Sequence, residues 1–236
     1  MENEVLLLAG TAAALGFVHT ILGPDHYLPF VVLSRARRWS RAKTALVTLA
    51  CGVGHILSSV ALGFAGIALG VAVFRLEAIE SARGQIAGWL LTAFGLAYLV
   101  WGLHRALRRR PHEHAHSHQD GTAHSHLHGH LGGHSHVHAA SGRTLTPWVL
   151  FTIFVFGPCE PLIPLVMYPA AEHNMASVVV VVSVFGLATL VTMLATVMAS
   201  VHGLRRIPVG SLERYSHALA GLAILLCGGA ITFLGL

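Results

Sequence analysis

The stretch Gly16–Phe30, GFVHTILGPDHYLPF, interrupts an apolar run near the N-terminus with two histidines, an aspartate and two prolines. Proline removes a backbone donor and clashes with the preceding turn, so the pair Gly23–Pro24 predicts a break in a helix. In a bilayer, an opened helix is tolerated only where it is buried in protein or lines a cavity. Ionisable side chains at such a position are costly, and they indicate a functional site.

The composition places the chain in a membrane. Of its 236 residues, 54% are hydrophobic and 11% are charged, and the mean hydropathy is +0.67. A soluble domain has about 25% charged residues, and a helix needs about 20 apolar residues to cross a bilayer. We therefore expect an all-α integral membrane protein with six transmembrane helices, the first and fourth interrupted by prolines: 5–33, 45–74, 84–103, 147–171, 175–201 and 218–236.

The basic residues predict the orientation of the chain. Most of the 15 lysines and arginines fall in the loops after the first, third and fifth spans. Because cytoplasmic loops carry the Lys/Arg excess, we expect a multi-pass protein of the bacterial inner (plasma) membrane with both termini outside. This placement also argues against a nucleic-acid partner, which the sequence pI near 9.6 would otherwise suggest. Residues 75–83, including Glu80 and Arg83, are expected to form an outer loop.

The segment 111–138, between the third and fourth spans, contains eleven histidines among Gly, Ser and Ala. Its low apolar content predicts disorder in the absence of metal. The chain thus divides into a first membrane repeat (1–103), a largely disordered cytoplasmic loop (104–146) and a second membrane repeat (147–236). Imidazole is a common metal ligand, and the loop is expected to capture metal ions weakly. The loop histidines are His112, His114, His116, His118, His124, His126, His128, His130, His134, His136 and His138.

The two membrane halves share a motif. Gly23-Pro24-Asp25-His26 in the first half corresponds to Gly157-Pro158-Cys159-Glu160 in the second, and further prolines follow each. Three spans per half give the halves opposite orientations, as in transporters built from inverted repeats. We expect two inverted three-helix repeats whose broken helices meet near the middle of the membrane. The alternative is a pair of independent proline kinks, which membrane helices tolerate.

The residues at and near the breaks are candidate ligands of a divalent cation. Carboxylates at the two breaks would neutralise the ion, and the mixture of imidazole, carboxylate and thiolate favours a late first-row metal. The alternative for each histidine is an interhelical hydrogen bond, and Cys51 and Cys227 are expected to be packing residues. The candidate ligands are His19, Asp25, His26, His55, Cys159 and Glu160.

His19, Asp25–His26 and Gly54–His55 resemble the H-x4-D-H and G-H signatures of bacterial nickel/cobalt transporters, although five residues separate His19 from Asp25. The Gly157–Cys159 break and the stretch 182–190 resemble the nickel/cobalt efflux (NicO-type) branch, which also carries a histidine-rich loop. The resemblance implies export of Ni²⁺ or Co²⁺, with Zn²⁺ as a further candidate. It implies no enzymatic activity and no prosthetic group, and the chain has no P-loop. The lipid bilayer and the divalent ion are the expected partners; a homo-oligomer and coupling to protons stay open.

The Gly-Pro-Cys break is also similar to the membrane thiol–disulfide carriers related to cytochrome c biogenesis, within the wider LysE-type superfamily. Those carriers place one cysteine in each repeat, but here the first repeat has Asp25 where the second has Cys159. The sequence therefore argues against thiol exchange in its usual form. The thiol-carrier hypothesis predicts that Cys159→Ser abolishes function while His26→Ala does not. A third hypothesis is a membrane-anchored metal buffer or chaperone, whose function would be lost on deletion of 111–138.

Overall fold

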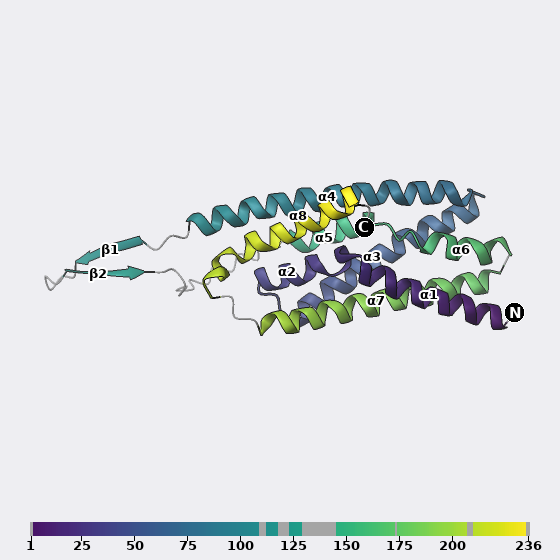
Figure 1. The fold of residues 1–236 in the computed structure, drawn as a ribbon, viewed down its shortest axis with the longest axis horizontal. Helices are drawn as coiled ribbons and strands as arrows, with labels where there is room; N and C mark the ends of the chain where they lie inside the picture. The colour runs from purple at the N-terminus through teal and green to yellow at the C-terminus, as the bar shows by residue number, and fades with distance from the viewer. Residues whose placement is uncertain are drawn as a thin grey trace.

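The computed structural model describes residues 2–108, 112–117, 123–128, 145–172, 174–206 and 210–234. Its helices run lengthwise in a single elongated bundle (Figure 1). Two short 3-10 helices, η1 (Pro24–His26) and η2 (Gly210–Tyr215), lie between longer elements. The α-helices are α1 (Glu2–Leu22), α2 (Leu28–Ala36), α3 (Arg41–Ala68), α4 (Val73–Arg108), α5 (Thr146–Phe156), α6 (Leu162–Ala171), α7 (Met175–Arg205) and α8 (Ser216–Leu234).

Five helices of the described residues are long and apolar enough to cross a membrane: α1, α3, α4, α7 and the segment Leu212–Leu234, which contains α8. The apolar helices α5 and α6 are shorter, and together they occupy the place of the fourth expected span. The chain is therefore an all-helical, multi-pass protein in its membrane part, as predicted. Its outward-facing apolar side chains contact the lipid bilayer.

The first and fourth segments are broken where the Gly-Pro pairs predict it. α1 ends at Leu22, Gly23 is extended, and η1 makes a single turn before α2 begins. α5 likewise ends at Phe156, and α6 begins only at Leu162. In Figure 1, α1 and α2 lie end to end along the bundle, and so do α5 and α6. Each break thus falls within the length of the bundle and not at its surface loops.

The helix α4 begins at Val73, well before the expected start at residue 84. The preceding helix α3 ends in a Schellman motif, in which Gly70 adopts φ +62° and Val71 N–H donates to Gly66 O (2.9 Å). This turn is tight, so α4 can start directly after it. The prediction that 75–83 form a loop is therefore wrong, and both Glu80 and Arg83 lie inside a helix.

Helices α4 and α8 pack backbone against backbone in opposite directions. A Cβ atom on Gly95 would overlap the backbone of Leu225, and one on Gly221 would overlap the backbone of Leu99. Glycines at such spacing allow two membrane helices to approach closely. This contact joins the last helix of the chain to the third membrane-crossing helix along much of its length (Figure 1).

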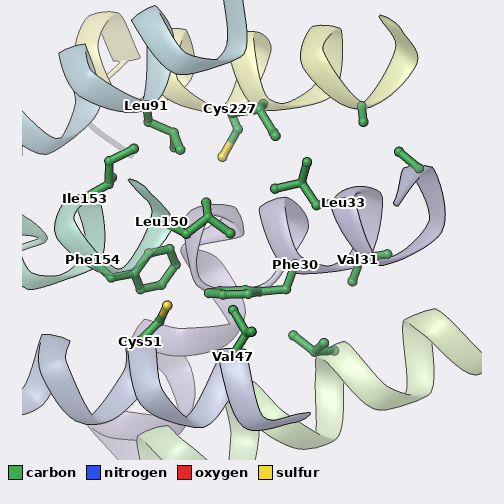
Figure 2. Packing of buried hydrophobic residues seen from close by; sticks show 14 of the residues in the cluster. Phe30, Val31, Leu33, Val47, Cys51, Leu91, Leu150, Ile153, Phe154 and Cys227 are labelled. Atoms are coloured by element: carbon green, nitrogen blue, oxygen red, sulfur yellow. The ribbon is translucent and has the colours of Figure 1, made fainter. Parts of the chain in front are cut away.

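A buried apolar core fills the space between the broken helices and their neighbours (Figure 2). The ring of Phe30 on α2 lies 4.8 Å from that of Phe154 on α5, centroid to centroid. Cys51 and Cys227 are buried on opposite sides of this core, and both are free thiols. They pack among apolar side chains, as the sequence predicted.

The loop between α4 and α5 contains a hairpin of two strands, β1 (His112–Ser117) and β2 (Ala123–His128). The strands are antiparallel, with His112 opposite His128 and His116 opposite His124. In these two segments histidine alternates with other residues, which is the period of a strand, and disorder of the loop in the absence of metal stays a prediction. The predicted ligands His118, His130, His134, His136 and His138 lie outside the described residues. The hairpin lies at the same end of the bundle as the α2–α3 and α7–α8 connections (Figure 1).

Candidate functional site

The break after α1 brings three imidazole rings together. His19 lies in the last turn of α1, His26 ends η1, and His55 belongs to α3. The ring centroid of His26 is 4.7 Å from that of His19 and 5.1 Å from that of His55. One ring nitrogen of each histidine lies within 4.8 Å of the others. In the part of the chain that the structure describes, no other group of three His, Cys, Asp or Glu side chains is placed to hold one metal ion.

The orientation of the rings leaves one nitrogen of each without a partner. The Nε2 atoms of all three histidines are buried and make no hydrogen bond within the described residues. Nδ1 of His26 lies 3.1 Å from Gly23 O and 3.1 Å from Asp25 Oδ1, and Nδ1 of His55 lies 3.4 Å from Phe154 O. These oxygens accept hydrogen bonds, so in neutral His26 and His55 the proton lies on Nδ1 and the lone pair on Nε2. Metal-binding imidazoles are held in the same way.

The other three predicted ligands lie outside this group. Asp25 contacts the far nitrogen of His26, and its side chain is 29% exposed. Cys159 is fully buried in an apolar cluster with Leu162 and Phe185. Glu160 is exposed. The structure therefore collects the three histidines, places Asp25 behind one of them, and separates the two residues of the second break from the group.

Both helix breaks contact the ring of His55. On one side lies His26 of the first break, and on the other Nδ1 faces Phe154 O in the last turn of α5. A Cβ atom on Gly157 would lie 3.0 Å from Nδ1 of His55, so the second break approaches the ring closely because it has a glycine there. One imidazole thus lies between the two Gly-Pro breaks of the chain.

A buried ion pair beside the second break was missed by the sequence reasoning. Glu80 and Arg83 of α4 pair with each other, and Glu80 Oε2 accepts a hydrogen bond from Cys159 N–H at 2.9 Å. Arg83 donates to Val155 O at 2.8 Å. The available signal was the spacing of the two charges, which puts them on one face of a helix. Because the sequence reasoning assigned Glu80 and Arg83 to a loop, this helical spacing was not recognised.

Residues 27–230 match the family described as "Cytochrome C biogenesis protein transmembrane region". Since this match covers most of the chain, the protein belongs to that family. No curated protein and no solved structure matches the chain.

The family match overturns the resemblance to nickel/cobalt transporters, and export of Ni²⁺ or Co²⁺ is wrong as the function of this chain. The match supports instead the alternative drawn from the Gly-Pro-Cys break. A physical reason for the error lies at Asp25. The extra residue between His19 and Asp25 interrupts the expected spacing, and the carboxylate lies against Nδ1 of His26, outside the group of three histidines.

Proposed function

We propose that this member of the cytochrome c biogenesis family is a membrane thiol–disulfide carrier and that Cys159 is its exchanging sulfur. The family match supports the class of chemistry. The observation that carries the proposal is the position of Cys159: of the chain's three cysteines, it alone lies at a helix break. Cys51 and Cys227 are packed within α3 and α8 and are unsuited to exchange.

With a single cysteine at the breaks, the exchange is intermolecular. The Cys159 thiolate attacks a disulfide of a first partner, so that a mixed disulfide forms and one partner thiolate leaves. A dithiol partner then attacks the Cys159 sulfur and releases the first partner fully reduced. The second thiolate of the dithiol partner then attacks that partner's own sulfur in the mixed disulfide. A disulfide closes within the dithiol partner, and the Cys159 thiolate is freed. Two electrons and two protons pass from the dithiol partner to the disulfide partner, and Cys159 is unchanged.

The test uses a Cys51→Ala/Cys227→Ala variant, in which Cys159 is the only cysteine of the chain. After membranes are quenched with acid, the proposal predicts a higher-mass adduct on non-reducing gels that disappears on reduction. The same chain with Cys159→Ala is the control and forms no adduct. Absence of the adduct, from protein whose Cys159 reacts fully with maleimide after denaturation, would contradict thiol carriage.

The histidine group favours a second candidate function, that of a membrane-anchored metal buffer or chaperone whose ion lies between the helices and not, as the sequence suggested, in the loop 111–138. Three imidazoles that each bring one ring nitrogen within 4.8 Å of the others, and whose buried Nε2 atoms have no hydrogen-bond partner, are a donor set suited to Zn, Cu, Ni or Fe ions. His19, His26 and His55 would hold the ion, and Asp25 would orient His26. The test is equilibrium binding of Co²⁺ to the chain lacking 111–138, read from its visible absorption. We expect one ion per chain, lost in His26→Ala and retained in the control His104→Ala, whose side chain is exposed.

The topology is part of the same proposal. We place residues 1–103 and 147–236 as two inverted three-helix repeats in a bacterial inner membrane, with the hairpin loop in the cytoplasm. The common position of the basic connections and the hairpin at one end, with the N-terminus at the other, supports this arrangement (Figure 1). Reporter fusions at the N-terminus and in the hairpin loop would test it. If both fusions reported the same side of the membrane, this arrangement would be contradicted.

A further inference from the structure

A buried charge pair adjoins the second helix break, on α4. The side chain of Glu80 is 0% exposed and that of Arg83 is 16% exposed, and the two form an ion pair one helical turn apart. Charges inside a membrane are costly and persist only when they are paired and hydrogen-bonded. The other contacts of this ion pair therefore indicate which part of the structure it stabilises.

Three of those contacts converge on the end of α5 and the segment that follows it. Glu80 Oε2 accepts from Cys159 N–H (2.9 Å), while Arg83 donates to Val155 O (2.8 Å) and approaches Gly157 O (3.4 Å). A broken helix leaves carbonyl groups at one end and N–H groups at the other without helical partners. The arginine serves the carbonyls at the end of α5, and the glutamate serves an N–H group beyond the break. One ion pair thus caps both sides of the opening.

Neighbouring elements also pack against the break. The hydroxyl of Ser59 on α3 donates to Glu80 (3.2 Å), and that of Ser58 accepts from Arg83 (2.7 Å). A Cβ atom on Gly84 would lie 2.8 Å from Pro158 Cγ, so the backbone of α4 packs directly on the break. On its other side, Cys159 lies in an apolar cluster and is 0% exposed. In this arrangement no thiol-bearing partner can reach the sulfur.

We infer that Glu80 and Arg83 form a latch that holds the second break closed over Cys159, and that opening of this latch controls access to the thiol. Closure by the latch follows from the contacts alone. Its role in controlling exchange rests on the proposed thiol carriage. Both residues act through the backbone at the break, and they are positioning residues.

The latch is tested by the rate at which N-ethylmaleimide alkylates Cys159 in the folded Cys51→Ala/Cys227→Ala protein in nanodiscs. This rate follows the population of the open form when opening and closing are fast. Loss of one charge-assisted hydrogen bond should raise it about ten- to a hundredfold in Glu80→Gln or Arg83→Gln. Arg83→Lys should restore part of the protection. The matched controls Glu77→Gln and Arg75→Gln remove the same charges from exposed positions of the same helix and should leave the rate unchanged.

A milder variant keeps the test decisive if the charge variants fail to fold. Ser59→Ala removes one hydrogen bond to Glu80 and a longer one from Arg83 (3.4 Å) without altering charge, and it should raise the rate about two- to fivefold. Equal rates in Glu80→Gln, Ser59→Ala and Glu77→Gln, with folded protein and full labelling in detergent, would overturn the latch. Because maleimide needs no biological partner, a confirmed latch without a mixed-disulfide adduct would refute thiol carriage alone. An adduct with unchanged labelling rates would refute only the latch.

Discussion

The imidazole of His26 meets that of His55 edge to face, with ring centroids 5.1 Å apart. His26 belongs to the first helix break, and His55 faces the last turn of α5 at the second. Each ring keeps its Nδ1 against a backbone carbonyl and leaves its Nε2 free. This pair of side chains therefore lies between the two helix breaks.

Asp25 is expected to tune metal binding by the histidines without being a ligand itself. Its carboxylate lies 3.1 Å from His26 Nδ1, and loss of such an outer partner costs about ten- to a hundredfold in metal affinity. Asp25→Asn should weaken Co²⁺ binding by that factor, whereas His55→Ala should abolish it. Competition titration with a chromophoric chelator measures both. An affinity for Asp25→Asn equal to that of the wild type would show that the contact has no role.

Metal binding at the three histidines should weaken in acid. An imidazole binds metal only when its lone pair is free, so protons compete with the ion for the Nε2 atoms. We expect the dissociation constant of Co²⁺ to rise steadily as the pH is lowered from 8 to 5. Titrations of the chain lacking 111–138 measure this effect without the loop histidines. A dissociation constant that is independent of pH would point to ligands other than imidazole.

The contact between α4 and α8 predicts that substitution of a glycine lowers the free energy of unfolding much more inside this contact than outside it. Gly95→Ala inserts a methyl group into the backbone of α8 and should lower the free energy of unfolding by about 1–3 kcal/mol. Gly10→Ala on α1 meets nothing within 4 Å and should be neutral or raise it by up to about 1 kcal/mol. Unfolding by SDS titration in mixed micelles gives both values. Similar losses at both positions would contradict the close packing.

The core around Phe30 should contribute strongly to stability. Phe30 is fully buried against Phe154, and truncation of a buried phenylalanine costs about 3–5 kcal/mol. The matched control is Phe233→Ala, because that ring is 72% exposed. The same SDS titration should separate the two variants clearly. Equal midpoints would indicate that the core in Figure 2 is not tightly packed.

The sequence predicted those features that depend on a local rule. Proline chemistry located both breaks, and hydropathy located the membrane helices. These rules act over a few residues, and the fold does not alter them. The chemistry of their side chains also made His19, His26 and His55 candidate ligands, but that the three rings lie together is a tertiary contact that only the structure shows.

Features that depend on tertiary contacts were not predicted correctly. Glu80 looks like a loop residue from its charge alone, and only the position of the second break beside α4 explains why a carboxylate is buried there. Glu160 occupies the position that corresponds to His26 in the shared motif, yet it is exposed. The motif fixes where the chain opens, whereas the neighbouring helices decide which side chain points inward.

The glycine contact between α4 and α8 has a mechanical consequence. Two helices whose backbones are in direct contact cannot slide past each other without first separating. We therefore expect α4 and α8 to form a rigid pair, called here the spine, that joins the two halves of the chain. A rocking motion of one half against the other would have to separate this spine. Motion that leaves this contact intact is therefore expected only in the short half-helices around the two breaks.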